Sequence, residues 1–272
     1  MDLVDDNVIC PTNTHLSPEP EICKVKIDEK YKFVKKGFFY NILYFFCYTL
    51  TFLIFFPITW LCYGVRVKGR KNLRKVKNAV FISNHVLPFD TFATTTHAIL
   101  FKHPYFISNH RPFKMPVIRH CVRYLRAVPL APTPSTTRNF LRDVDGALKN
   151  GKSILIYPEG AMWDYYPKIR PFMPGAFRFS IKNNVPIVPI VITFRKACWL
   201  YRILGRKKPF ATINILEPIT ISKDIPQKQK EQELELLCYN TMTEYFNANN
   251  QISYFSKPVQ TILKPQNETE KE

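Results

Sequence analysis

The sequence predicts an α/β fold with a mainly parallel sheet flanked by helices, preceded by a hydrophobic membrane-anchoring helix or helix pair. From Ala79 onward, short apolar runs alternate with helical patterns, as strands and crossover helices do in parallel sheets. Ahead of them, the segment from Phe38 to Tyr63 contains no charged side chain. At 272 residues, the chain has room for one sizeable catalytic domain and an appended element.

Each element follows from its pattern and its boundaries. The apolar runs predict strands at Ala79–Ser83, Tyr105–Ser108, Ala127–Leu130, Ser153–Tyr157, Ile187–Thr193 and Ala211–Leu216. The intervening patterns predict helices at Phe89–Leu100, Pro116–Tyr124, Thr136–Asn150, Gly175–Lys182 and Gln227–Asn247. The third of these helices is closed by Gly151, and the polar helix at 227–247 is expected to pack outside the sheet.

Composition divides the chain into four segments. Residues 1–23, rich in acids and prolines, and residues 257–272, mostly polar in composition, are expected to be disordered tails. Residues 24–77 form the predicted membrane anchor with its basic flanks, and residues 78–256 form the catalytic domain. The acidic start does not match a secretory signal, so we expect the N-terminus to stay uncleaved.

The apolar segment Phe38–Tyr63 is long enough to cross about 30 Å of hydrocarbon as one helix. A buried core helix is the alternative, but such a helix normally keeps a polar face. Lysines precede the segment, and lysines and arginines follow it, so both flanks favour the cytosolic side. This pattern favours a bent or re-entrant helix pair, with Pro57 as a possible bend, over a single span. The catalytic domain is then expected at the cytosolic face of a membrane.

Thirty-nine Lys and Arg against twenty-one Asp and Glu give a formal charge of +18. Such a charge attracts a polyanion, an anionic leaflet or acidic soluble partners. No glycine-rich phosphate loop, RNA-binding aromatic signature or zinc module accompanies it, so we expect no nucleic-acid partner. A non-catalytic membrane-tethered binder of anionic lipid or nucleic acid is the distant alternative. The seven scattered cysteines show no zinc-ligand spacing and favour a reduced domain.

A first candidate site follows the strand that ends at Ser83. His85 lies just beyond the strand's carboxyl end, where active sites of open α/β sheets gather, and Asp90 falls in the first turn of the next helix. A histidine held by a carboxylate keeps one tautomer and can take a proton from an attacking hydroxyl. The alternative is that Asp90 caps its helix. No third ligand occurs at a recognisable spacing, so a metal is not expected.

A second candidate site follows the strand at Ser153–Tyr157. It ends in Pro-Glu-Gly, in which Gly160 permits close backbone approach, and Glu159 can accept hydrogen bonds from substrate hydroxyls or brace the histidine loop. An ordinary turn with a solvated Glu159 is the alternative. Ser83 and Cys121 lack a nucleophile-elbow context, so a hydrolase triad is not supported. The other histidines have no carboxylate at the matching spacing and are expected to be structural or exposed; they are His15, His97, His103, His110 and His120.

These two strand ends resemble the motifs of the 1-acylglycerol-3-phosphate acyltransferase family of phospholipid and glycerol acyltransferases. Residues 84–90 match its Asn-His-x4-Asp motif, residues 157–160 resemble its Phe-Pro-Glu-Gly motif, and residues 185–189 match Val-Pro-Ile-Val-Pro. The resemblance implies a glycerolipid acyltransferase-like fold in which His85 deprotonates an acceptor hydroxyl and Asp90 orients His85. It further implies that Glu159 and Gly160 bind the acceptor, that Pro186 shapes the acyl side, and that no metal takes part. The implied co-substrate is acyl-CoA or acyl carrier protein, with no resident cofactor.

The sequence departs from the family where phosphate is usually bound. Thr-Arg of the third motif is replaced by Ala161-Met162, and the second motif is degenerate at residues 125–130. Nearby basic residues are the candidates for binding the acceptor phosphate, and a solvated or lipid-facing basic surface is the alternative for each of them. They are Arg138, Lys168, Arg170 and Arg178. The expected reaction converts 1-acylglycerol-3-phosphate to phosphatidic acid in phospholipid biosynthesis, and the alternative acceptor is a lysoglycolipid or another lipid alcohol. The expected partners are membrane lipids and the acyl donor, and oligomeric state cannot be derived from sequence.

Overall fold

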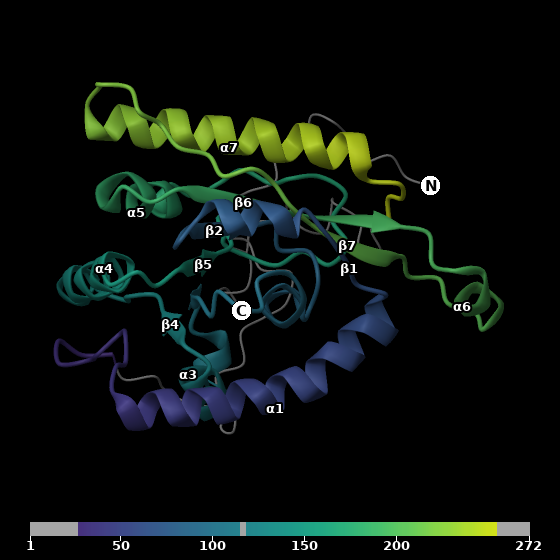
Figure 1. Cartoon of the computed structure of the whole chain (residues 1–272), viewed down its shortest axis with the longest axis horizontal. Coiled ribbons are helices and arrows are strands. Elements are labelled where there is room, and N and C mark those ends of the chain that lie inside the picture. The colour runs from purple at the N-terminus through teal and green to yellow at the C-terminus, as the bar shows by residue number, and fades with distance from the viewer. Residues whose placement is uncertain (1–26, 115–117, 255–272) are drawn as a thin grey trace, which may run out of the picture.

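A seven-stranded sheet forms the centre of the computed structural model, which describes residues 27–114 and 118–254 (Figure 1). The strand order is β1-β7-β6-β2-β5-β3-β4. All neighbouring strands are parallel except β6 and β7, which are antiparallel. The strands are β1 Arg66–Lys68, β2 Val80–Ser83, β3 Tyr105–Ser108, β4 Ala127–Pro129, β5 Ile154–Ile156, β6 Ile187–Arg195 and β7 Phe210–Ile215. The predicted α/β fold with a mainly parallel sheet is confirmed.

The central strands are apolar along their whole length because both of their faces are buried. In β2, Val80 and Ile82 point into the core beneath α4, α5 and α7, whereas Phe81 points into the core on the opposite face. All four residues of β2 are buried, and its neighbours pair with it in register, Val80 opposite both Ile154 and Ile187. The carboxyl ends of β2 and β5 therefore lie side by side.

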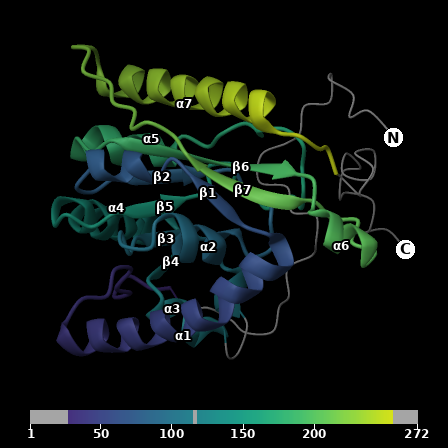
Figure 2. The ribbon, with the colours of Figure 1, turned by 45° about the vertical axis from the view of Figure 1, so that its right-hand side comes forward.

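Helices cover both faces of this sheet (Figures 1 and 2). One face carries α4 (Pro134–Lys149), α5 (Gly175–Asn183) and α7 (Gln227–Asn249). The other face carries α1 (Phe38–Tyr63), α2 (Asp90–Ala93), the π-helical turn η2 (Thr94–Ala98), η3 (Arg111–Lys114) and α3 (Ile118–Tyr124). The predicted helix 89–100 is thus α-helical in α2 and continues as the π-helical turn η2. Part of the predicted helix 116–124 lies outside the described residues. So do the predicted tails at 1–23 and 257–272.

Four elements were not predicted from sequence: β1, the 3₁₀ helices η1 (Arg70–Lys75) and η3, and α6 (Trp199–Ile203). β1 is an edge strand of three residues, too short to show an alternation, yet it pairs with β7. The predicted domain start at residue 78 is therefore wrong, because the sheet already includes Arg66. Phe33, assigned to the basic flank, is likewise 1% exposed and packs on Phe140 of α4.

The apolar segment forms one uninterrupted helix, α1, which includes Pro57. The helix pair favoured by the flanking charges is therefore wrong within this segment. Among the described residues, α1 is the one helix long and apolar enough to cross a membrane, and 11% of its apolar window is buried. That low burial disagrees with the core-helix alternative, because most of its large apolar side chains face outward.

The inner side of α1 packs on α2 and η2, the helical turns that begin at Asp90. Phe55 stacks on Phe92 with ring centroids 4.2 Å apart, and the Tyr48 hydroxyl donates to the Thr95 carbonyl oxygen at 3.0 Å. Thr59 Oγ1 lies 2.7 Å from His97 Nε2, and Phe56 stacks on the His97 ring. α1 therefore contacts the turns that position Asp90.

His97 gives this contact a pH dependence. Burial lowers the pKa of His97 from 6.5 to about 4, so the folded chain binds fewer protons here than the unfolded chain between these values. Stability contributed by neutral His97 is present above pH 6.5 and is lost as the pH falls toward 4. We expect His97→Asn to flatten this part of the dependence of the thermal midpoint on pH, measured in detergent. The exposed His120 on α3 serves as control, since His120→Asn should keep the wild-type slope.

Candidate active site

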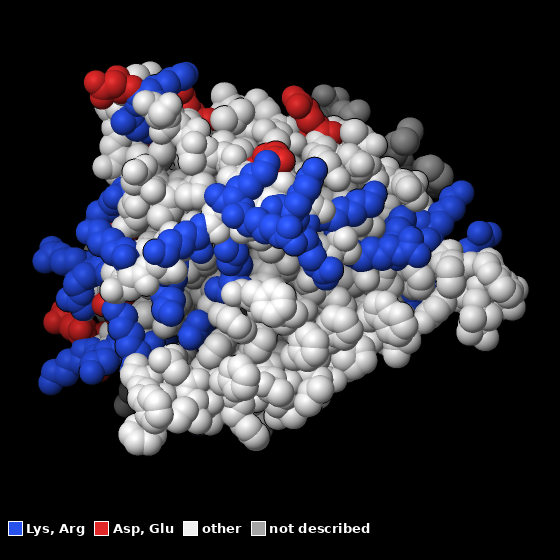
Figure 3. All heavy atoms as spheres, viewed as in Figure 1, with Lys and Arg blue, Asp and Glu red and all other residues white. Residues whose placement is uncertain are grey.

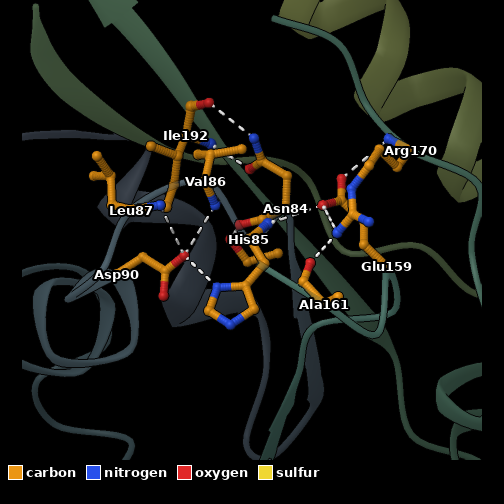
Figure 4. Close-up of polar contacts among 10 residues, drawn as sticks. Asn84, His85, Val86, Leu87, Asp90, Glu159, Ala161, Arg170 and Ile192 are labelled. Atoms are coloured by element: carbon orange, nitrogen blue, oxygen red, sulfur yellow. Dashed lines mark hydrogen bonds and ion pairs between the residues drawn. The ribbon is translucent and has the colours of Figure 1, made fainter. Parts of the chain in front are cut away.

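His85 and Asp90 form a close pair at the carboxyl end of β2 (Figure 4). His85 Nδ1 lies 2.7 Å from Asp90 Oδ2, and the same oxygen accepts the Val86 and Leu87 backbone N–H groups at 3.1 and 3.4 Å. The Asp90 side chain is 1% exposed and that of His85 is 24% exposed. An ionised carboxylate only accepts hydrogen bonds, so Nδ1 carries the proton and Nε2 is left as a base that faces away from Asp90.

The fold of the loop, rather than helix capping, sets the direction of the Asp90 carboxylate. Asp90 is the first residue of α2, and no side-chain cap hydrogen bond is made at the preceding Phe89. The carboxylate turns back to the N–H groups of Val86 and Leu87, which precede it in the chain. The capping alternative is therefore not what the structure shows.

Asn84 fixes the start of this loop to the neighbouring strand β6. Its side-chain Nδ2 donates to the Ile192 carbonyl oxygen at 3.0 Å, and its Oδ1 accepts the Ile192 N–H at 2.8 Å. Asn84 is fully buried, so losing these two hydrogen bonds would leave polar groups unpaired in the core and destabilise the fold. The sequence predicted no role for Asn84 beyond its place in the motif, because its partner Ile192 lies 108 residues away along the chain.

Glu159 braces the histidine loop from the end of β5. Its Oε2 accepts the His85 N–H at 3.2 Å and an Arg170 Nη2 hydrogen bond at 3.3 Å, while Oε1 accepts the Arg170 N–H at 3.1 Å. Arg170 Nη2 also donates to the Ala161 carbonyl oxygen. Burial raises the pKa of Glu159, and the Arg170 guanidinium opposes that rise. One buried ion pair thereby joins the loop after β2 to two parts of the connection between β5 and α5.

This placement changes the predicted roles of Glu159 and Arg170. Both side chains are 1% exposed and bind each other, so neither offers a surface to an acceptor headgroup in this structure. The solvated-turn alternative for Glu159 is excluded by the same burial. Gly160 closes the turn by donating its N–H to the Tyr157 carbonyl oxygen at 3.1 Å. Its φ of 75° is in the left-handed region that favours glycine.

Tyr157 is a further site residue, for which the sequence predicted a strand end and the first position of the motif at residues 157–160 but no role beside His85. Its ring stacks on the His85 ring with centroids 4.3 Å apart and planes at 25°. Its hydroxyl oxygen is buried, as are Asp90 Oδ1 and Thr94 Oγ1, for which no hydrogen-bond partner is found among the described residues. Burial raises the pKa of Tyr157 well above its usual value and the Asp90 carboxylate raises it further, so the hydroxyl stays protonated.

The other predicted acceptor residues do not meet at His85. Arg138 and Arg178 line a cavity of about 550 Å³ formed only by residues of α4 and α5, and Arg178 Nη2 lies 3.8 Å from Asp145 Oδ2. These helices cover the face of the sheet opposite to α2. Lys168 lies half-buried in the segment between β5 and α5. They were predicted to bind the same phosphate only because they are near one another along the chain.

Pro186 lies at the opposite end of the sheet from His85. Its carbonyl oxygen accepts the N–H of Val80, the first residue of β2, whereas His85 follows the last. β6 and β2 are parallel, and Ser83 at the end of β2 lies opposite Ile190. Pro186 is four residues before Ile190, so it lies about 13 Å along the strand direction from the end of β2. This register disagrees with the predicted acyl-side role. Within residues 27–114 and 118–254, no group of three or more His, Cys, Asp and Glu side chains could hold a metal ion.

The fold is that of a glycerolipid acyltransferase. The crystal structure of the 1-acyl-sn-glycerophosphate acyltransferase PlsC from Thermotoga maritima superposes with a TM-score of 0.52 at 22% identity, covering 80% of this chain and 81% of that one. At this identity, the likeness concerns the fold alone.

Sequence comparisons find acyltransferases that are similar to part of the chain. The profile of the Acyltransferase family matches residues 64–193, which contain both strand ends of the site. The chloroplastic 1-acyl-sn-glycerol-3-phosphate acyltransferase BAT2 of Brassica napus is 30% identical over 48% of this chain and 37% of the relative. A 1-acyl-sn-glycerol-3-phosphate acyltransferase of Limnanthes douglasii is 23% identical over 60% of this chain and 57% of the relative. The chain thus spans less than two thirds of these relatives. Residues 64–193 are therefore similar to acyltransferases, and this similarity covers about half of the chain.

Proposed function

We propose that this chain transfers a fatty acyl group from acyl-CoA or acyl carrier protein to the free hydroxyl of 1-acylglycerol-3-phosphate, giving phosphatidic acid. The observation that carries the proposal is the His85–Asp90 pair, joined at 2.7 Å with Nε2 directed away from the carboxylate. The names of its relatives supply the substrate class. The exposed apolar face of α1 supports a location at a membrane, where such substrates reside.

In this mechanism, His85 Nε2 takes the proton of the acceptor hydroxyl as the oxygen attacks the thioester carbonyl carbon. Asp90 holds Nδ1 and stabilises the imidazolium that forms. Collapse of the tetrahedral intermediate breaks the carbon–sulfur bond, and the departing thiolate recovers the proton from His85. The products are the new ester and the free thiol, so no acyl-enzyme is needed.

The brace around Glu159 supports this chemistry by holding the loop that carries the base. Its hydrogen bond to the His85 N–H and the Asn84 contact with β6 fix the backbone at residues 84 and 85, which carry the imidazole. A base held in place needs no reorganisation when the acceptor arrives. We assign Glu159 and Arg170 to this positioning role, with Gly160 shaping the adjoining turn.

The test is acyl transfer by the full chain purified in detergent, with acyl-CoA and 1-acylglycerol-3-phosphate, followed by free-thiol release and by chromatography of the lipid product. We expect phosphatidic acid to form in step with thiol release. Thiol release without a lipid product would indicate thioester hydrolysis and contradict the proposal. An acyl carrier protein donor, run in parallel, separates the two donor types.

A second acceptor class is favoured by one observation: Ala161-Met162 replaces the family's Thr-Arg, and the nearby Arg170 is occupied by Glu159. The same His–Asp chemistry then acts on a lysoglycolipid or another lipid alcohol. A panel of phosphate-bearing and phosphate-free acceptors distinguishes the two. Turnover confined to phosphate-free acceptors would overturn the phosphatidic acid assignment and leave the mechanism intact.

Tyr157 provides a prediction about the same base. Tyr157→Phe keeps the ring stacked on His85 and removes the hydroxyl buried beside Asp90. We expect kcat to fall by less than about tenfold, or roughly 1.4 kcal/mol, with KM unchanged, because the variant removes a polar group beside the Asp90 carboxylate and no direct hydrogen bond found among the described residues. Because the hydroxyl is not ionised in the assay range, the ratio of wild type to variant should be the same at low and high pH.

Tyr165→Phe is the matched control. Tyr165 is also buried with a hydroxyl that has no hydrogen-bond partner found among the described residues, and its ring packs on Phe194 rather than His85. An equal loss of kcat in both variants would show that Tyr157 acts only through general stability.

A further inference from the structure

A second apolar surface lies away from the active site, on the connection between β6 and β7. This connection, residues 195–210, is called the α6 hairpin here because it contains α6. Four large apolar side chains are exposed at its tip: Trp199 at 70%, Leu200 at 49%, Ile203 at 72% and Leu204 at 75%. Exposing four such side chains together is unfavourable in water, so this surface is expected to meet an apolar partner.

Basic side chains surround the apolar tip. No Asp or Glu occurs from residue 195 to residue 210, and six cations do. They are Arg195, Lys196, Arg202, Arg206, Lys207 and Lys208. Apolar and aromatic side chains bordered by cations are typical of segments that lie in the interface of an anionic bilayer. Tryptophan in particular prefers the headgroup level.

The base of the α6 hairpin is fixed to the end of α1. Arg195 Nη2 donates to the Gly64 carbonyl oxygen, and the Phe210 ring lies so close to Gly64 that an added Cβ would be 2.3 Å from its Cγ. Gly64 ends α1 in the left-handed conformation with φ of 55°. The base of the α6 hairpin is therefore held against the end of α1.

The two apolar surfaces also lie on one side of the molecule. Figure 3 shows Lys and Arg side chains in a band across the face viewed, with the uncharged surface of α1 below the band. The uncharged end of the α6 hairpin lies at the right-hand end of that surface, as comparison with Figure 1 shows. α7 lies on the opposite side of the sheet from α1 in both ribbon views.

We propose that the α6 hairpin is a second membrane contact, which places Trp199, Leu200, Ile203 and Leu204 in the interface of an anionic bilayer and its cations among the headgroups. The proposal rests on the proposed location of α1 at a membrane. One helix alone leaves the domain free to turn about the helix axis. A second contact, joined rigidly to the end of that helix, fixes the orientation of the catalytic domain on the bilayer.

The three tryptophans make this testable in the full chain. Trp60 lies on α1 and is 57% exposed, Trp199 lies on the hairpin, and Trp163 is fully buried. The protein is reconstituted in vesicles of phosphatidylcholine and phosphatidylglycerol whose acyl chains carry bromine near the headgroup. In the Trp60→Phe variant, the change in fluorescence comes from Trp199, and in the Trp199→Phe variant it comes from Trp60. The buried Trp163 adds a constant fluorescence to both. We expect brominated lipid to reduce the emission of both reporters.

Charge reversal tests the role of the cations. In the Trp60→Phe background, Arg202→Glu with Lys207→Glu should lower Trp199 quenching, because each cation near an anionic surface changes binding by roughly fivefold. Both side chains are exposed. Lys228→Glu with Lys230→Glu on α7 is the matched control. In this variant, brominated lipid should quench Trp199 as much as in the Trp60→Phe parent. Vesicles of phosphatidylcholine alone should give weaker quenching of Trp199.

The outcomes separate this proposal from the location of α1. Quenching of Trp60 without quenching of Trp199 overturns the hairpin proposal and leaves α1 at the membrane. Failure of both reporters to respond, with the protein still bound to vesicles, contradicts both. Equal quenching of Trp199 in neutral and anionic vesicles overturns the role assigned to the cations. Shielding of Trp199 by self-association, detected as a doubled mass in detergent, assigns the surface to a second copy instead.

Discussion

Replacing His85 by alanine is expected to lower kcat for acyl transfer by about two to four orders of magnitude, the contribution of a positioned general base. The fold should survive, because the imidazole is partly exposed and its hydrogen bond is to Asp90 alone among the described residues. The backbone N–H of residue 85 remains to bind Glu159. Thiol release from acyl-CoA, measured with saturating acceptor, gives the rate, and circular dichroism in detergent checks the fold.

Asp90→Asn provides the companion measurement. An amide at this position no longer holds Nδ1–H as a carboxylate does, so the imidazole loses its fixed tautomer and the stabilisation of its charged form. We expect a loss of similar order, and little further loss in the double variant because the two residues act as one unit.

His120→Ala controls for removing an exposed imidazole outside the site. It should retain wild-type activity. Wild-type rates in His85→Ala would exclude the base mechanism even if phosphatidic acid is the product.

The largest effect on stability is expected at the ion pair between Arg170 and Glu159. Both side chains are 1% exposed, so Arg170→Met leaves a buried carboxylate without its countercharge, a change that typically costs about 3–5 kcal/mol. Glu159→Gln should cost less. An amide keeps acceptor capacity for the Arg170 N–H groups, and burial already disfavours the charged form of Glu159.

The dependence on pH distinguishes this cause from simple loss of packing. Burial raises the pKa of Glu159 in the folded chain, and removing Arg170 takes away the influence that lowers it. A raised pKa in the folded state means stability present at low pH and lost as the pH rises. Arg170→Met should therefore be most destabilised at alkaline pH and recover partly near pH 5, as measured by thermal unfolding in detergent.

Lys75→Met is the matched control for this pair. Lys75 binds Glu217 at 2.5 Å, but the two side chains are 53% and 59% exposed, and exposed pairs contribute at most about 1 kcal/mol. Its thermal midpoint should change little and show no added pH dependence. If the thermal midpoint of Arg170→Met is as close to wild type as that of Lys75→Met, the buried pair contributes no net stability.

Local patterns were sufficient for the alternation of strands and helices. Tyr105–Ser108 was predicted with its observed bounds, and α4 and α5 within two residues, because buried strands and capped helices leave continuous local signals. α4 begins with a Thr133 capping box and Pro134. β1 and α6 left no such signal, since each is five residues or shorter and is fixed by partners far along the chain.

By itself, the sequence determined which side chains lie at the two strand ends, because His85, Asp90 and Glu159 follow short apolar runs that become neighbouring strands. Only the tertiary structure decided which basic residues gather there. Arg170 is taken into a buried pair, whereas Arg138 and Arg178 face a cavity between α4 and α5. The physical reason is that nearness along the chain does not fix the face of the sheet to which a helix packs. Pairing across the sheet likewise brought Asn84 to Ile192 and Tyr157 to His85.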